Sequence, residues 1–140
     1  MNSKDLGTIR SHDKIYLNEN RKINTKESFK FLVKKSSEFI NSTENPDILD
    51  IGCATGDFVY YLSKTFPQAK CVGMDVIDDL LDRAKKEVPN VKFILSDISN
   101  KNSLPSEKFD VIFMVGVHPI FDDIFTVFDN AISMIKKNGK

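Results

Sequence analysis

The segment from Ile48 to Phe66 constrains the fold of this chain more than any other. It opens with a short apolar run ending in Asp50-Ile51, continues through small residues at positions 52, 54 and 56, and then shows apolar residues at helical spacing. A short apolar run is typical of a buried strand, and small residues permit a tight turn whose backbone can approach a ligand. The segment therefore predicts a strand, a tight turn and a helix in direct succession.

Two interpretations of this turn can be compared on its residues. A dinucleotide-binding loop has the pattern Gly-x-Gly-x-x-Gly, so that a pyrophosphate can lie on the N-terminus of the following helix. Starting that pattern at Gly52 puts Ala54 and Asp57 at the second and third glycine positions. Asp50 and Asp57 would also repel an anion. A phosphate-binding loop is therefore disfavoured, and a tight turn without a ligand stays open.

The alternation of an acidic residue with three small ones resembles a different glycine-rich loop. Asp50, Gly52, Ala54 and Gly56 match the loop of class I S-adenosylmethionine-dependent methyltransferases. The resemblance implies that S-adenosylmethionine is the cofactor. Its sulfonium and amino group carry positive charge, which carboxylates next to the loop would favour.

The rest of the chain repeats the alternation of strands and helices. The second and third apolar runs each end in an acid, Asp75 and Asp97, as the first does. Apolar strands that alternate with helices imply a parallel sheet covered on both faces. We therefore expect an α/β fold, a doubly wound Rossmann-like sheet, with Asn24 and Glu27 forming a capping box and Asp78 capping a later helix. The expected strands lie near 47–52, 71–75, 91–95 and 109–115, and the expected helices near 24–40, 56–66, 78–88 and 121–135.

The resemblance implies a set of cofactor-binding residues at the carboxyl ends of these strands. Asp75 would accept hydrogen bonds from the ribose hydroxyls, and Val76 would pack on the adenine. Asp97 and Ile98 would contact the adenine, although Asp97 would equally make an ordinary Asx turn. The full set is Asp50, Gly52, Cys53, Ala54, Gly56, Asp75, Val76, Asp97, Ile98 and Gly116.

His118 is the titratable residue nearest the expected position of methyl transfer, in the segment after the fourth strand. It is a candidate for the substrate pocket and for a general base, and alternatively it caps the last helix. Methyl transfer requires little beyond proximity and alignment, so the catalytic residue stays unassigned. His12 and Tyr16 lie in an N-terminal arm of the kind that closes over the cofactor in related enzymes.

Composition favours a soluble, cytoplasmic, globular protein. The chain is 41% hydrophobic and 29% charged, has no apolar run of membrane-spanning length, and does not open like a signal peptide. Cys53 and Cys71 fit neither a zinc spacing nor a disulfide framework, so we expect no metal site and two buried thiols. The first 35 residues hold nine Lys or Arg against four Asp or Glu. This basic segment either attracts an anionic substrate or forms a solvated face.

The domain organisation expected from these patterns has two parts. Residues 1–23 would form an N-terminal arm or lid, and residues 24–140 an S-adenosylmethionine-binding methyltransferase domain. A full class I domain has seven strands, and the pattern here lacks the last three, so the domain is expected to be C-terminally incomplete. The strand at 109–115 would then be an open sheet edge, which favours a homodimer through that edge.

The expected function is S-adenosylmethionine-dependent methyl transfer to a small molecule. The segment Gly116 to Ile120 lacks the Asn/Asp-Pro-Pro-aromatic motif of amino-directed nucleic-acid methyltransferases, so DNA is not expected as a substrate, and neither is a membrane partner. The alternative is a non-catalytic S-adenosylmethionine-binding or interaction module, because part of the usual substrate site is missing.

Overall fold

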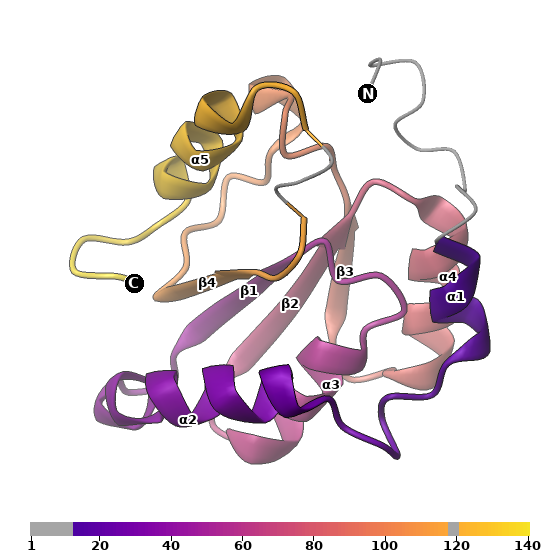
Figure 1. The fold of residues 1–140 in the computed structure, drawn as a ribbon. Coiled ribbons are helices and arrows are strands. Elements are labelled where there is room, and N and C mark those ends of the chain that lie inside the picture. The colour runs from indigo at the N-terminus through magenta and orange to yellow at the C-terminus, as the bar shows by residue number, and fades with distance from the viewer. Residues whose placement is uncertain (1–12, 118–120) are drawn as a thin grey trace.

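The strands form one parallel sheet. The computed structural model describes residues 13–117 and 121–140, and its sheet has the strand order β3-β2-β1-β4 (Figure 1). In this sheet Ile51 at the end of β1 pairs with Met74 of β2 on one side and with Met114 of β4 on the other. The expected doubly wound parallel sheet is confirmed. The strands are β1 (Asp47–Ile51), β2 (Lys70–Asp75), β3 (Lys92–Leu95) and β4 (Val111–Met114).

Helices cover both faces of this sheet. In Figure 1, α2 and α3 lie on one face, α5 lies on the opposite face, and α1 lies beside α4 next to the β3 edge. A 3₁₀ turn, η2, interrupts the polar connection between β3 and β4. The helical elements are α1 (Asp13–Asn18), α2 (Glu27–Ser42), α3 (Asp57–Thr65), α4 (Asp78–Glu87), η2 (Lys101–Ser103) and α5 (Ile124–Ser133).

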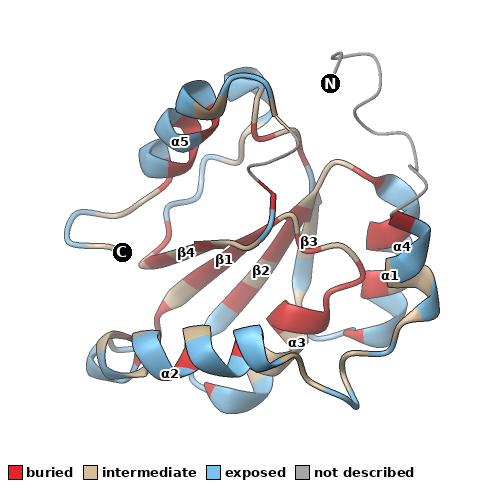
Figure 2. Cartoon of the chain, in the orientation of Figure 1, coloured by how far each residue is buried: buried red, intermediate tan, exposed pale blue. Residues whose placement is uncertain are grey.

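Alternate residues of β1 enter two separate hydrophobic clusters, as expected for a strand buried on both faces. Ile48 belongs to the cluster beneath α2 and α3, whereas Leu49 and Ile51 pack on the α5 side with Met74 and Val127. All five side chains are almost completely buried. The red colour of β1 and its neighbours in Figure 2 shows the same central core.

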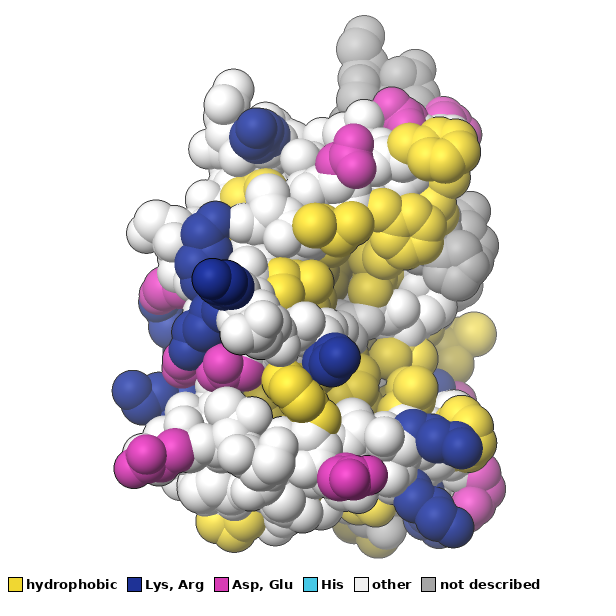
Figure 3. All heavy atoms as spheres, turned by 90° about the vertical axis from the view of Figure 1, so that its left-hand side faces the viewer, with side chains coloured by type: hydrophobic (Ala, Val, Ile, Leu, Met, Phe, Trp, Pro, Cys, Tyr) yellow, Lys and Arg dark blue, Asp and Glu magenta, His cyan; other side chains and the backbone are white. Residues whose placement is uncertain are grey.

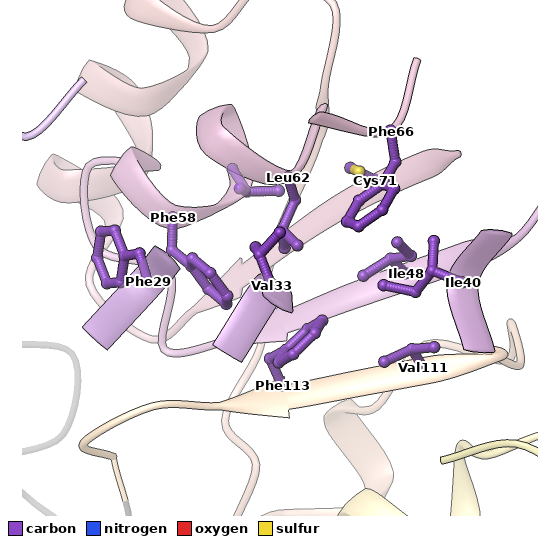
Figure 4. Packing of buried hydrophobic residues seen from close by; sticks show 11 residues of the cluster. Phe29, Val33, Ile40, Ile48, Phe58, Leu62, Phe66, Cys71, Val111 and Phe113 are labelled. Carbon is purple, nitrogen blue, oxygen red and sulfur yellow. The ribbon is translucent and has the colours of Figure 1, made fainter. Parts of the chain in front are cut away.

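Aromatic rings join the first cluster across three elements. Phe58 of α3 lies between Phe29 of α2 and Phe113 of β4, with ring centroids 4.8 and 5.1 Å away, the second pair edge to face (Figure 4). Such aromatic pairs add about 0.5–1.5 kcal/mol beyond the area that they bury. Because Phe58 follows the glycine-rich turn directly, this packing fixes where α3 begins relative to the sheet.

The start of α2 differs from the sequence-based expectation. Its N-cap residue is Lys26, and no side chain caps the helix, so Asn24 and Glu27 do not form the expected capping box. The helix begins at Glu27, whereas the sequence predicted a start near residue 24. Its N-cap side chain is instead drawn toward aromatic neighbours, because the Lys26 ammonium lies 5.5 Å from the Tyr16 ring and 5.8 Å from the Phe29 ring.

The start of α4 is also different. Asp78 is the first residue of the helix rather than its cap, and the N-cap residue is Ile77. No side chain caps α4. The Asp75 carboxylate instead holds the link before the helix, since Oδ1 accepts hydrogen bonds from the backbone amides of Val76 at 2.8 Å and Ile77 at 2.9 Å.

The outer edge of β4 is partly occupied by the C-terminal segment. The Lys140 amide donates to the Asp110 carbonyl at 2.8 Å, and the Ile112 amide donates to the Lys140 carbonyl at 2.9 Å. Phe109 and Ile135 form a parallel bridge just before β4. The strand is an edge strand, as expected, but its first half is paired and only the part after Ile112 has no described neighbour on this side.

Large apolar side chains of α5 are exposed on the same side of the molecule. Phe125 is 80% exposed, Ile132 62% and Phe128 44%, while the opposite side of α5 buries Val127 and Ala131. Figure 3 shows hydrophobic side chains gathered at the top of this side and in the band below it. Among the described residues, none of the helices combines the length and the apolar character that a bilayer crossing requires.

Candidate functional site

The candidate site lies where the strand order reverses, between β1 and β4. Ligands of open α/β sheets bind beyond the carboxyl ends of the strands at such a point. Two adjoining cavities open there, of about 630 and 670 Å³ counting the space open to solvent, and Tyr16, Gly52, Ala54, Val115 and Gly116 line both. The first cavity is also lined by Asp13, Ile51, Met74, Asp75, Val76, Leu80, Ser96, Ile98, Val117 and Phe121. The second is also lined by Lys26, Ser28, Phe29, Asp50, Cys53, Thr55, Asp57 and Phe58.

The glycine-rich turn lies against the end of β2. Gly52, Ala54 and Gly56 have φ angles of 75°, 48° and 83°, a region that residues with side chains rarely adopt. The amides of Gly52 and Cys53 donate to the Met74 carbonyl at 2.7 and 3.0 Å. This pairing presses the loop against the sheet and leaves its outer side facing the cavities.

Gly52 also permits a close contact with the segment after β4. A Cβ atom at position 52 would lie 2.0 Å from Cγ2 of Val117, a distance that no packing tolerates. Val117 is itself buried and lines the first cavity. The absence of a side chain at position 52 therefore lets the segment that follows β4 lie directly on the glycine-rich turn.

Asp75 holds three backbone amides around the first cavity. Its Oδ2 accepts from the Ala54 amide at 2.8 Å, in addition to the amides of Val76 and Ile77 on Oδ1. Burial raises the pKa of Asp75, and these three hydrogen bonds oppose that rise. A carboxylate offers about four acceptor positions. Asp75 thus ties the turn to α4 and keeps acceptor capacity for a ligand.

Asp50 is a buried carboxylate at the second cavity with no hydrogen-bond donor among the described residues. It is only 3% exposed. Burial, and secondarily the charge of Asp75, raise the pKa of Asp50 well above its usual value. Among the described residues no fully buried side-chain oxygen lacks a hydrogen-bond partner. The unpartnered oxygens of Asp50 therefore border the second cavity, where a ligand group that donates hydrogen bonds or carries positive charge can reach them.

Cys53 and Gly56 follow the turn but have different surroundings. Cys53 lines the second cavity, its thiol is buried as expected, and burial raises its pKa, so the thiol stays protonated. Gly56 lines neither of the two cavities. It is the N-cap residue of α3, and a Cβ atom there would lie 3.1 Å from the Phe93 ring and 3.3 Å from Ala84. Its role in this structure is the close packing of the turn on α4 and β3.

The end of β3 contributes differently from the expectation. Ile98 is buried and lines the first cavity, together with the adjacent Ser96, which the sequence analysis missed. The Asp97 carboxylate instead accepts from the Ser99 amide at 2.9 Å and the Ser99 hydroxyl at 2.7 Å. This is the Asx-type turn that the sequence left open, and Asp97 lines neither cavity as described.

The N-terminal segment contributes two side chains to the cavities, one that the sequence did not indicate and one that it did. Asp13 at the start of α1 is 2% exposed. It lines the first cavity together with Asp75, and the two carboxylates interact through their charges. Tyr16, the arm residue expected to approach the cofactor, lines both cavities. His12 and His118, the two histidine candidates, lie outside the described residues.

Comparison with known proteins places this geometry in a family. The family model described as a methyltransferase domain matches residues 48–139, about two thirds of the chain. A malonyl-[acyl-carrier protein] O-methyltransferase of Ilyobacter polytropus is 30% identical over 115 residues, which are 79% of this chain and 42% of that protein. A trans-aconitate 2-methyltransferase of an Enterobacter species is 30% identical over 93 residues, 66% of this chain and 36% of that protein.

Solved methyltransferase structures share this fold. The plantazolicin methyltransferase BamL, solved with a triazolic desmethylPZN analog and SAH, is 28% identical with a TM-score of 0.69, covering 90% of this chain and 47% of that one. The chain therefore belongs to the class I S-adenosylmethionine-dependent methyltransferase family, as the glycine-rich turn suggested. It spans about two fifths of the length of the curated relatives that it matches.

Proposed function

We propose that this chain forms the S-adenosylmethionine-binding part of an enzyme that transfers a methyl group to a small molecule. The observation that carries the proposal is the unpartnered Asp50 carboxylate beside the glycine-rich turn. In the proposed pose the methionine amino group meets Asp50, and the methionine carboxylate lies toward the Lys26 ammonium at the wall of the second cavity. The ribose hydroxyls meet Asp75 at the first cavity.

The adenine, in this proposal, occupies the apolar end of the first cavity. Val76 and Ile98 line that end from the carboxyl ends of β2 and β3, and Leu80 closes it from α4. Val76 and Ile98 were expected on the resemblance to contact the base, and both line this cavity, which supports that assignment. Asp97 lines neither cavity and holds Ser99 through Oδ1, so we assign the base contacts to the apolar residues.

The charge of the site favours a cationic cofactor over a phosphate-bearing one. Asp13 and Asp75 line the first cavity. Asp50 lines the second with Lys26 and with Asp57, whose carboxylate is already paired with the Lys22 ammonium. Carboxylates within a few ångströms disfavour an anion strongly in a partly buried site. S-adenosylmethionine, when bound, supplies an electrophilic methyl group on a positively charged sulfur. The residues of this chain would orient it and exclude water from it.

The small-molecule acceptor is supported by the relatives. One of them is named for trans-aconitate, a small carboxylic acid, and another for a malonyl group carried on acyl-carrier protein. The solved BamL structure carries a desmethylPZN analog. Val117 and Phe121 flank the first cavity on the β4 side, where the acceptor would approach the methyl group. Because methyl transfer depends mainly on alignment, no general base is required by the proposal.

Transfer of labelled methyl groups tests this proposal. The protein is incubated with methyl-labelled S-adenosylmethionine and a panel of small carboxylic acids, an RNA pool and a protein pool, and the label in each fraction is counted. We expect label in the small-molecule fraction. Label confined to RNA or protein would contradict the proposed acceptor class.

The non-catalytic module remains the second candidate, and one observation favours it. The chain spans about two fifths of the length of its curated relatives, so more than half of each relative lies outside the matched region. Cofactor binding without label transfer to any fraction would support this module, whereas turnover by the 140-residue chain would exclude it.

We also propose that the 140-residue chain self-associates through the side formed by α5 and the free half of β4. Phe125, Phe128 and Ile132 expose apolar surface there, next to unpaired strand edge beyond Ile112. We expect a dimer or larger species in light scattering after size exclusion at tens of micromolar. Phe125→Ser should shift the population toward monomer, while a matched exposed change on α2, Phe31→Ser, should not; a wild-type monomer would contradict the proposal.

A further inference from the structure

Lys22 lies between α1 and α2 and joins three separate parts of the structure. Its ammonium donates to the Thr55 carbonyl at 3.0 Å, to Asp57 Oδ1, and to Glu87 Oε2 at 2.7 Å. Thr55 and Asp57 belong to the glycine-rich turn and the start of α3, and Glu87 ends α4. The Lys22 side chain is only 11% exposed. A buried lysine with three oxygen acceptors is fully used as a donor, since an ammonium has three protons.

A second link joins α1 to the end of α4. The Arg83 guanidinium donates from Nε to Glu87 Oε1 at 2.6 Å and from its terminal nitrogen to the Leu17 carbonyl in α1. Burial raises the pKa of Glu87, but the hydrogen bonds from Lys22 and Arg83 outweigh that effect and lower it. Glu87 is therefore a charged bridge between the two cations that hold the N-terminal segment.

The segment fastened in this way carries two side chains of the cofactor cleft. Asp13 and Tyr16 lie on α1, a helix of six residues that is too short to be stable by itself in water. Their positions at the cavities therefore depend on contacts outside the helix. Asp13 and Asp75 also repel each other, which raises the pKa of Asp75 and opposes the approach of α1 to the site.

We propose that Lys22 is a positioning residue for the cofactor site, because it fastens the segment 13–22 to the glycine-rich turn and so sets Asp13 and Tyr16 against the bound cofactor. The inference rests on the proposed binding of S-adenosylmethionine. In this proposal the segment 13–22 forms one side of the cofactor site. The position of that side depends on the ion pairs of Lys22 with Asp57 and Glu87. Loss of the cluster lowers the fraction of molecules with a complete site, and the apparent affinity falls by the same fraction.

Two matched substitutions test this role. Lys22→Met removes the ammonium and keeps most of the side-chain volume. Arg21→Met removes the neighbouring cation, whose side-chain hydrogen bonds among the described residues go to Glu19 of the same segment, the shorter at 3.0 Å. We expect Lys22→Met to weaken S-adenosylhomocysteine binding about tenfold in titration calorimetry. Arg21→Met should bind like the wild type, and equal affinities for all three proteins would overturn the proposal.

Hydrogen exchange separates positioning from a general loss of stability. In Lys22→Met without ligand, the amides of residues 15–22 should exchange faster, while those of β1 and β2 keep their wild-type protection. Glu87→Gln leaves the contacts of Lys22 with the glycine-rich turn in place. It should also speed exchange in residues 15–22 and weaken S-adenosylhomocysteine binding, but less than Lys22→Met does. Weaker binding with unchanged exchange in residues 15–22 would contradict the mechanism. If the wild type fails to bind S-adenosylhomocysteine, the proposed function fails, and the exchange comparison still tests the fastening.

Discussion

Asp75→Ala is expected to weaken S-adenosylhomocysteine binding by at least about tenfold, because the acceptor position that its three amide bonds leave open can take a ribose hydrogen bond worth about 1.5–3 kcal/mol. The loss follows from the acceptor capacity that Asp75 retains at the first cavity. Titration calorimetry of both proteins measures it. An unchanged dissociation constant would show that the ribose is held elsewhere.

The same substitution should also destabilise the protein, because the amides of Ala54, Val76 and Ile77 lose their acceptor. Each unsatisfied amide that becomes buried costs about 1–3 kcal/mol. Asp75→Asn is the matched control, since its carbonyl oxygen can keep the two amides at the start of α4. A ligand without ribose hydroxyls should bind wild type and Asp75→Asn equally, which separates the ribose contact from the structural role.

Asp50→Asn is expected to stabilise the ligand-free protein and to weaken the cofactor at the same time. Burial and the nearby charge of Asp75 raise the pKa of Asp50 well above its usual value, so the folded state binds this proton more tightly than the unfolded state. Stability contributed by the protonated form is therefore present at low pH. It is lost as pH rises from the usual carboxyl value through the raised pKa.

Thermal unfolding against pH measures this linkage. The gain from Asp50→Asn should be near zero at acidic pH and should grow with pH to about 1 kcal/mol or more, which is several degrees in melting temperature. S-adenosylhomocysteine affinity should fall about tenfold in the variant, because an amide cannot pair with the ammonium as a carboxylate does. A variant that melts below the wild type at neutral pH would show that an unseen donor satisfies Asp50.

Much of the fold follows from local pattern. Each apolar run became a strand, and the run at 109–115 is the edge strand β4. The starts of α2 and α4 were harder to predict. Several polar residues precede each helix, and the tertiary contacts decide where the helix begins. Asp78 is the first residue of α4 and not its cap, and no side chain caps this helix, because Asp75 holds the preceding amides of Val76 and Ile77.

The candidate site was predictable where one motif defines it. The first cavity is lined by four of the predicted residues, Gly52, Ala54, Asp75 and Val76. The local pattern indicates where each strand ends, and neighbouring parallel strands bring these ends to the same edge of the sheet. Asp13 was missed, since only the folded chain brings it to the cavity that Asp75 lines, far away in the sequence. Lys22 was missed for the same reason: a lysine in a basic segment resembles a solvated one until its three acceptors are in place.

The central claim is that the cleft at the carboxyl ends of β1, β2 and β4 binds S-adenosylmethionine. Titration calorimetry of the wild-type chain with S-adenosylhomocysteine, with NAD⁺ at the same concentrations as the comparison ligand, tests it most directly. We predict saturable heat at a stoichiometry of one for S-adenosylhomocysteine and none for NAD⁺. No heat and no thermal shift with millimolar S-adenosylhomocysteine, on protein that is shown to be folded, would contradict the claim.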